Sequence, residues 1–309
     1  PSYRSDNDFY NIGLFLEQRV GDFAFEAAFN RQHTFRTISR PLSFNFALLG
    51  DPNKFLPNGQ LNRNAGKLYI DGAEGSGNIN LTRNLVDTVT DYRLTASYDL
   101  DLRKHKLGRF LDLGHHMFAG LLTRTDSVNT DDTLNEMNLT PVGTQNLTLI
   151  NFSRRSYLDL SSSDLNLRGF QDPARYPFTG QGGVTTGLVR TGNAHRNDLT
   201  RLDVKMIAVQ SAFFNDHLWF TGGLREDKQR VWGSGGAVRD PITRLWGKRT
   251  RNLFPRYAKG TTRTYGVVYN VRDWVSAYFN NANSFLPQNA RDLEGELIGN
   301  RAGIGKDMG

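Results

Sequence analysis

The chain alternates apolar and polar residues with a period of two, and no other feature constrains its fold as strongly. In residues 91–102, DYRLTASYDLDL, one face of an extended strand would carry Tyr92, Leu94, Ala96, Tyr98, Leu100 and Leu102, and the other mainly polar residues. Helical spacing is scarce, and Gly, Asn, Asp, Ser and Thr are too frequent for long helices. The sequence therefore predicts an all-β protein.

Three segments each combine two such strands around a short corner. The corners are Gly21-Asp22, Asn215-Asp216 and Arg272-Asp273. Glycine, asparagine and aspartate tolerate the positive φ angles that two-residue hairpin turns need. Residues 115–126, HHMFAGLLTRTD, are expected to return beside 92–102 after a longer corner. Around Gly21-Asp22, the expected apolar faces are Ile12, Leu14 and Leu16 on the first arm and Phe23, Phe25, Ala27 and Phe29 on the second. Around Asn215-Asp216, they are Leu202, Val204, Met206 and Ala208, and then Leu218, Phe220, Gly222 and Leu224. Around Arg272-Asp273, they are Tyr265, Val267 and Tyr269, and then Val275, Ala277 and Phe279.

The connections between these hairpins are unequal in length. We expect about eight strands in four antiparallel hairpins, with connections near 35–90, 126–197 and 228–262 that are far longer than those usual in compact domains. Short turns at one end and long loops at the other are typical of outer-membrane β-barrels. Aromatic residues near the short corners fit an interfacial girdle, although aromatics also favour strands in general; they are Phe23, Phe214, Trp219 and Trp274.

Composition narrows the function classes. No stretch approaches the roughly 18 consecutive apolar residues of a membrane helix, whereas a barrel strand needs only about 10 residues with every second one apolar. The formal charge is +7, but the 38 Lys and Arg residues are interleaved with 31 Asp and Glu residues, so no basic face for nucleic acid is expected. The absence of cysteine excludes disulfides, thiol catalysis and thiolate metal sites.

The segment 239–263 is the candidate ligand-binding region. It combines many cations with aromatic residues, and guanidinium groups with aromatic faces suit a bulky anionic ligand that has flat rings. The alternative is a solvated loop that faces anionic lipopolysaccharide. The predicted ligand-binding residues are Arg244, Trp246, Lys248, Arg249, Arg251, Arg256 and Tyr257.

Catalytic and cofactor motifs are not recognisable. The glycine runs GQGGV and GSGGAV lack the Lys-Ser/Thr of a phosphate-binding loop. His115 and His116 begin a strand, so they are expected to point to opposite faces and not to chelate one ion. Carboxylates on the strands, such as Glu17 and Glu26, are expected to face a hydrated lumen. We therefore predict no enzyme activity, no cofactor and no metal site.

Two segments resemble a known family. Residues 210–229, QSAFFNDHLWFTGGLREDKQ, resemble a barrel hairpin of TonB-dependent outer-membrane receptors. Residues 264–288, TYGVVYNVRDWVSAYFNNANSFLPQ, are similar to the following hairpin, which in that family ends in a Ser-Phe-x-Pro segment. The tail 295–309, GELIGNRAGIGKDMG, looks like the stretch that leads into the next strand, and weaker likeness extends over 10–32 and 95–102.

The resemblance implies a 22-stranded barrel in the bacterial outer membrane, closed by an N-terminal plug. Such receptors import scarce ligands, for example iron–siderophore complexes or cobalamin, with energy from the TonB complex. The implied partners are outer-membrane lipid, lipopolysaccharide, TonB and a small anionic ligand such as a ferric siderophore. No plug or TonB box precedes Phe9 and no terminal strand ends in an aromatic residue. We therefore expect residues 1–309 to be a portion of the barrel domain, with the plug and the C-terminal strands outside this chain.

Two alternatives remain at this point. A passive porin, or a complete eight-stranded barrel, is disfavoured because RAGIGKDMG offers no closing strand. A soluble all-β binding or carbohydrate-active sandwich shows the same alternation. In a sandwich, apolar residues such as Tyr92, Leu94, Phe25 and Phe220 would be buried against a second sheet. In a barrel they would lie outside, with Arg93, Glu26 and Arg201 inside.

Overall fold

The fold consists of β-strands. The computed structural model describes residues 4–40, 48–71, 81–104, 113–138, 155–157, 186–243, 245–272, 274–286 and 301–309. No helix in these ranges is long and apolar enough to cross a membrane. The elements are β1 (Arg4–Val20), β2 (Phe23–Arg40), β3 (Leu48–Gly50), β4 (Leu68–Asp71), β5 (Leu81–Asp101), the short 3-10 helix η1 (Leu102–Lys104), β6 (His115–Asn138), β7 (Arg155–Tyr157), β8 (Thr186–Phe213), β9 (Leu218–Trp232), β10 (Arg256–Arg272), β11 (Val275–Leu286) and β12 (Arg301–Met308).

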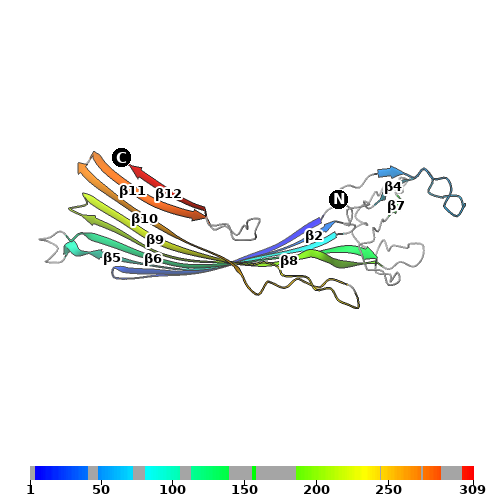
Figure 1. Ribbon diagram of the computed structural model, residues 1–309, viewed down its shortest axis with the longest axis horizontal. Helices are drawn as coiled ribbons and strands as arrows, with labels where there is room; N and C mark the ends of the chain where they lie inside the picture. The colour runs from blue at the N-terminus through cyan, green and yellow to red at the C-terminus, as the bar shows by residue number, and fades with distance from the viewer. Residues whose placement is uncertain are drawn as a thin grey trace, which may run out of the picture.

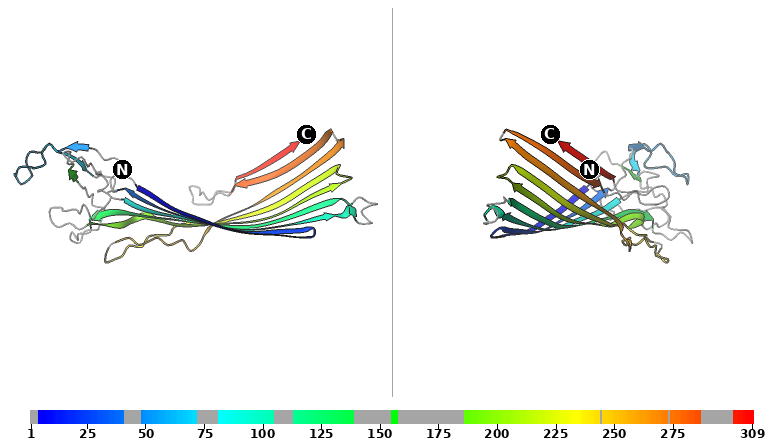
Figure 2. Two further views of the ribbon diagram at one scale, coloured as in Figure 1. Left: turned by 180° about the vertical axis from the view of Figure 1, so that it is seen from behind. Right: turned by 60° about the vertical axis from the view of Figure 1, so that its left-hand side comes forward.

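Nine of these strands form one twisted antiparallel sheet (Figures 1 and 2). Their order, β1-β2-β5-β6-β8-β9-β10-β11-β12, follows the chain. The prediction of an antiparallel all-β fold is confirmed. Among the described residues β1 and β12 do not pair, so the sheet is open and these strands are its edges. The tail forms a strand, because residues 301–308 pair with β11, but it does not pair with β1 and so is not a closing strand; a neighbouring strand with free backbone groups can order a glycine-rich segment of low strand propensity.

The two ends of the sheet differ, as predicted (Figure 1, short turns at the left). The turns at one end comprise residues 21–22, 214–217 and 273–274, together with the longer β5–β6 connection 102–114 that was predicted, and the connections at the other end comprise 41–80, 139–185, 233–255 and 287–300. The β8–β9 turn is longer than the predicted two-residue corner, since Phe214 shares positive φ angles with Asn215 and Asp216 (55°, 52° and 67°). In the β10–β11 turn, Asp273 lies outside the described residues.

The strands extend much further from the short turns than the alternation predicted. β5, β6 and β8 have 21, 24 and 28 residues, so the predicted connections 35–90 and 126–197 were too wide. The additional length carries polar residues on both faces, and cross-strand ion pairs replace apolar contacts there. Arg201 binds Asp126 through two bonds of 2.6 and 2.8 Å, and Arg190 binds Asp132 through two bonds of 2.6 and 2.7 Å.

The register assigns every strand residue to one of two faces. Residues directly opposite one another share a face, and one such row is Phe23, Tyr98, Phe118, Val209, Gly222 and Tyr265. We call the face that carries this row the apolar face and the other the polar face. Glu26 and Arg93 lie on the polar face, as predicted. The predicted apolar face of β8 was wrong, because Ile207, and not Met206 or Ala208, lies opposite Leu224.

Two further side chains lie on a face other than the one expected. β8 has apolar residues on both faces, so its own alternation is ambiguous and only pairing with β6 and β9 fixes its orientation. Arg201 consequently lies on the apolar face, beyond its apolar part, and not on the inside as predicted. Trp219, predicted for an outward girdle, lies opposite Ala212 on the polar face and donates its indole N–H to the carbonyl of Asp216 at 2.8 Å.

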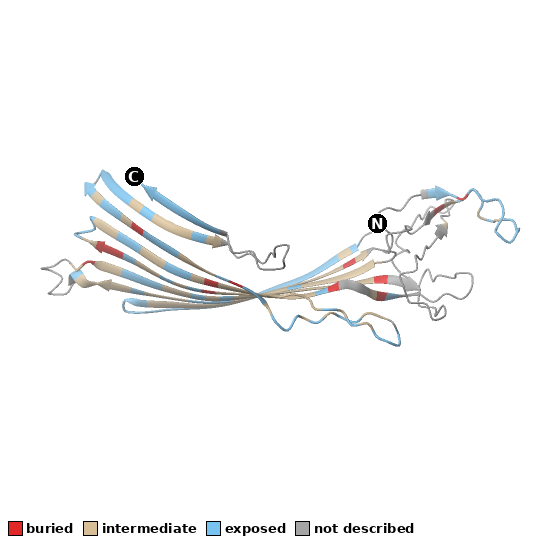
Figure 3. Cartoon of the chain, in the orientation of Figure 1, coloured by how far each residue is buried: buried red, intermediate tan, exposed pale blue. Residues whose placement is uncertain are grey.

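A belt of exposed apolar side chains occupies the apolar face near the short turns. Ile207 is 64% exposed and Leu224 is 41% exposed, and no second sheet covers the face within the described residues (Figure 3). The sandwich alternative is therefore wrong for this part of the chain, since Tyr92, Leu94 and Phe220 are exposed. We define the belt as Leu14, Leu16, Val20, Phe23, Tyr92, Leu94, Tyr98, Phe118, Leu122, Ile207, Phe220, Leu224, Tyr265 and Tyr269.

Candidate functional site

The β9–β10 connection, residues 233–255, is an irregular hairpin at the end of the sheet opposite to the short turns. Isolated bridges pair Ser234 with Arg251 and Arg239 with Trp246. The Asp240 carboxylate closes the tip, since it accepts the backbone N–H groups of Thr243 at 2.7 Å and Ile242 at 2.8 Å. These backbone hydrogen bonds, that of Thr243 first, lower the pKa of Asp240. The Arg-rich segment thus has a defined backbone.

Three contacts tie this hairpin to β8. The backbone N–H of Arg249 donates to Nδ1 of His195 at 2.9 Å, and the Arg251 guanidinium donates to Oδ1 of Asn197 at 2.9 Å. The Asp198 carboxylate accepts both the backbone N–H and the hydroxyl of Ser234 at 2.7 Å. His195 is only 2% exposed, so the hairpin anchors on a buried group.

A cluster of charges surrounds His195. Burial lowers the pKa of His195, and the cations Arg190, Lys248 and Arg249 lower it further, against the opposing effect of Asp132. Burial alone would raise the pKa of Asp132, but the Arg190 guanidinium and the neighbouring cations outweigh this effect, and the pKa is lowered. At neutral pH His195 is therefore a neutral acceptor beside an ionised Asp132–Arg190 pair.

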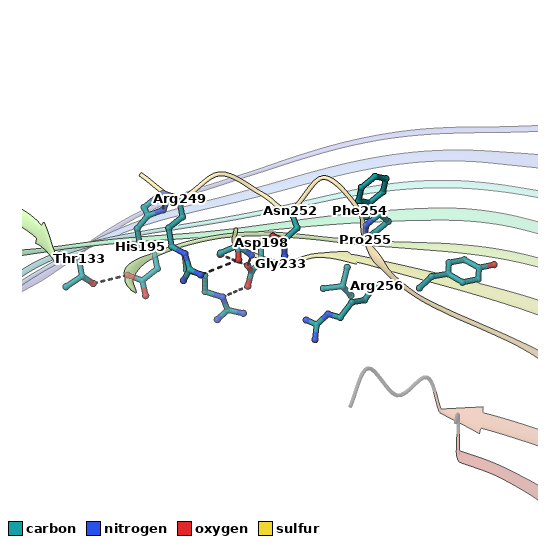
Figure 4. A pocket seen from close by; sticks show the side chains of 14 residues that line it. Thr133, His195, Asp198, Gly233, Arg249, Asn252, Phe254, Pro255 and Arg256 are labelled. Carbon is teal, nitrogen blue, oxygen red and sulfur yellow. Dashed lines mark hydrogen bonds and ion pairs between the residues drawn. The ribbon is translucent and has the colours of Figure 1, made fainter. Parts of the chain in front are cut away.

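A cleft of about 1090 Å³ opens between the hairpin and strands β6, β8 and β9 (Figure 4). Its walls mix both signs of charge with flat side chains: Asp131, Arg196, Asp198, Arg256, Phe254 and Tyr257. Arg196 is paired with Asp198, whereas Arg256 is exposed and forms no ion pair with the described residues. Such walls can hold an anionic, ring-containing ligand by charge-assisted hydrogen bonds and stacking.

The structure separates the predicted ligand-binding residues into three groups. Arg249, Arg256 and Tyr257 line the cleft. Trp246, Lys248 and Arg251 do not line it: Trp246 lies under the Arg239 guanidinium at 5.7 Å, Arg251 holds Asn197, and Lys248 is exposed. Arg244 lies outside the described residues.

The Arg249 guanidinium has a structural task, because it donates to the carbonyl oxygens of Gly235 and Ser234 across the hairpin. Asp131, Arg196 and Asp198 were missed by the sequence reasoning, since Asp131 and Arg196 fall in the range 126–197 that was predicted to be a connection and Asp198 directly follows it. The Arg-x-Asp spacing of Arg196 and Asp198, which puts both on one face of a strand, was the only available signal.

A small three-stranded sheet, β3-β4-β7, joins two of the long connections at the same end of the chain. Its central group is Asp51, which is 3% exposed and accepts the backbone N–H of Asn53 at 3.0 Å and the Asn62 side-chain amide at 2.9 Å. The Tyr157 hydroxyl also donates to Asp51. The connections 41–80 and 139–185 are therefore joined by the pairing of β4 with β7.

The described ranges contain no candidate metal site. Within them, no group of three or more His, Cys, Asp or Glu side chains is arranged to hold an ion. His115 and His116 point to opposite faces, as predicted: His115 contacts Asp99, and His116 contacts the Ser211 hydroxyl at 2.9 Å.

Comparisons with known proteins give a likeness in structure. No family model matches the chain, and no curated protein matches its sequence. Two solved structures from Pseudomonas aeruginosa are similar: FpvA bound to heterologous pyoverdines, at 12% identity, and the ferripyoverdine receptor of the outer membrane bound to ferripyoverdine, at 13% identity. Each has a TM-score of 0.38 and covers 99% of this chain, and the chain spans 45% of the length of each.

Proposed function

We propose that this chain is a portion of the β-barrel of a bacterial outer-membrane receptor that imports an iron–siderophore complex with energy from TonB. The exposed belt is the observation that carries the membrane location. If each belt residue exposes about half of the 150–250 Å² of a large side chain, the belt exposes on the order of 1,000 Å². The largest apolar patch of a typical soluble monomer is about 300–600 Å². Lipid is the solvent that suits such a surface.

The height of the belt agrees with a bilayer. Along β8 the apolar face carries Phe213 beside the short turn and Ile207 of the belt, and Lys205 follows on the same face. The eight steps from Phe213 to Lys205 correspond to about 26 Å along the strand and about 20 Å in height, at roughly 3.3 Å per residue and a tilt near 40°. The apolar band of an outer-membrane barrel is about 25 Å tall.

The cleft and the belt are suitably placed for a receptor. The cleft lies at the end of the long connections, where outer-membrane barrels carry their extracellular loops. Its strand residues Asp131, Arg196 and Asp198 belong to the polar face, which faces the lumen when the belt faces lipid. Arg256 on the polar face and Phe254 supply the cation and the ring that a ferric chelate with anionic and aromatic groups requires. Tyr257 lies opposite Arg230 on the apolar face, so we do not include its ring in the proposed site. The resemblance of residues 210–229 and 264–288 to TonB-dependent receptors supports the same proposal.

The test is growth and uptake under iron limitation. A clean deletion is expected to lose uptake of one labelled ferric siderophore, and both the intact gene and a variant with Lys54→Ala, a remote exposed lysine, are expected to restore it. Uptake should also stop when TonB is removed. Normal siderophore uptake in the deletion strain would contradict the proposed ligand class. Slower entry of many small solutes, independent of TonB, would indicate a passive porin instead.

A further inference from the structure

The belt contains a groove. Two adjoining cavities, of about 740 and 500 Å³, lie on the apolar face across β5, β6, β8 and β9 and share Ala96, Gly120, Ile207 and Leu224. Ala96 and Gly120 lie opposite each other in the register, and the Ala96 methyl group and the bare backbone of Gly120 form the floor. Tyr98 and Phe118 flank the floor toward the short turns. The result is a continuous apolar channel in a surface that is otherwise covered by large side chains.

Cations gather at the end of the groove that is remote from the short turns. Lys205 and Glu226 line the second cavity, and Arg263 lines the first. Glu226 accepts the ammonium groups of Lys259 at 2.7 Å and Lys228 at 3.0 Å. The four cations and one carboxylate leave a local charge of +3. All five residues are on the apolar face: Arg263 lies opposite Leu224 in the last apolar row, Lys205 and Glu226 form the next row, and Lys228 and Lys259 lie in the row after that.

The arginines beside Asp203 differ from the cations at the end of the groove. Asp203 lies opposite Lys228 and pairs with Arg124 of the same row at 2.7 Å and with Arg230 of the following row at 2.5 Å, so both of these guanidiniums have a carboxylate partner. Lys205 and Arg263, by contrast, form no ion pair within the described residues and are exposed. The unbalanced charge therefore lies where the groove ends, about 20 Å in height from the short turns by the spacing given above.

We propose that the groove and its cations bind one molecule of lipopolysaccharide, with an acyl chain of its lipid A in the groove and a lipid A phosphate at Lys205, Lys228, Lys259 and Arg263. An apolar channel that ends in net positive charge at a membrane boundary complements an acylated anionic lipid. The choice of lipopolysaccharide rests on the proposed function, because a receptor of the outer membrane would have this end of the sheet in the outer leaflet.

Two variants test the two halves of the site in the intact protein, extracted from outer membranes in mild detergent. The double variant Lys205→Ala/Lys259→Ala removes two cations and is expected to bind lipopolysaccharide roughly 30-fold more weakly, because one basic side chain near an anionic lipid surface contributes about fivefold. Gly120→Leu fills the groove. A Cβ at Gly120 meets only the carbonyl of Met206, at 4.0 Å, so the sheet accommodates it. Displacing about two methylene groups of the acyl chain should weaken binding roughly tenfold.

The matched controls are Lys54→Ala/Lys67→Ala, which removes the same charge from an exposed segment, and Gly50→Leu, where an added Cβ meets nothing within 4 Å. Native mass spectrometry counts the lipopolysaccharide that each protein retains and rebinds after delipidation. Equal retention by the test variants and the wild type would overturn the proposal. Equal binding of phosphatidylglycerol would overturn the choice of lipid. Siderophore uptake, measured in the same cells, reports on the proposed function separately.

Discussion

The assignment of the faces predicts that Ile207→Arg is destabilising in a bilayer. Ile207 lies six residues from Phe213, which corresponds to about 20 Å along β8 and about 15 Å in height. This position is inside the apolar band but about 5 Å in height from Lys205, so an arginine on the lipid face is expected to cost about 1–2 kcal/mol, between the values for the midplane and for the interface. The side chain is 64% exposed, its cross-strand neighbours are Gly120 and Leu224, and the carboxylate of Glu226 in the next row already binds Lys228 and Lys259.

The adjacent residue provides the control. Ala208 is on the polar face, opposite Ala119 and Gly223, so an arginine there has room and points into water. Ala208→Arg is expected to cost about 0.5 kcal/mol or less. The assay is the denaturant dependence of unfolding of the intact protein in phospholipid vesicles, with the wild type in parallel. If both variants lose the same stability, or if Ala208→Arg loses more, the face that we assign to lipid is not the lipid-facing one.

Three further outcomes follow from the site and the turns. The folded-state pKa of His195 is lowered, so its contribution to stability is complete above the unfolded value near 6.5 and is lost as pH falls through the folded value; the protection factors of the amides around Arg249, corrected for the intrinsic exchange rate at each pH, should fall in acid, and His195→Gln should remove this pH dependence. Arg256→Ala and Phe254→Ala should each weaken binding of the ferric siderophore about tenfold at an unchanged unfolding midpoint, and equal affinities would exclude the cleft. Gly21 has a φ angle of 61°, so Gly21→Val should cost about 1–2 kcal/mol in a folding titration.

The sequence predicted the strands where the two faces of the sheet differ in polarity. Near the short turns one face of each strand carries the apolar belt, so residues 91–102 alternate and the strand could be predicted. Beyond Arg124 both faces carry polar groups, and the period-two signal ends although backbone pairing continues to Asn138. The extra length of β6 depends on cross-strand partners such as Asp126 with Arg201, and these are defined only by the register.

The residues of the cleft also differ in whether local sequence could predict them. Arg256 and Tyr257 could be found from local composition, because one segment supplies both a cation and a ring. Asp131 and Arg196 come from other strands, and only the pairing of β6 with β8 brings them to the same cleft. The composition of the segment made Arg249, Arg251 and Arg256 equal candidates for ligand binding. In the structure, the Arg249 guanidinium donates to the backbone of the hairpin and the Arg251 guanidinium donates to Asn197.

An irregularity between β6 and β8 explains how the charge cluster at the cleft is assembled. Asp132 lies opposite His195, but Leu134 lies opposite Arg190, so β6 advances two residues while β8 advances five. In a regular strand, residues five positions apart are about 16 Å apart and point to opposite faces. The bulge instead brings Arg190 within 2.6 Å of Asp132 while His195 stays beside the same carboxylate. The register shift thus adds Arg190 to the anchor of the Arg-rich hairpin, and a regular β8 would leave the Asp132 carboxylate beside His195 without this guanidinium.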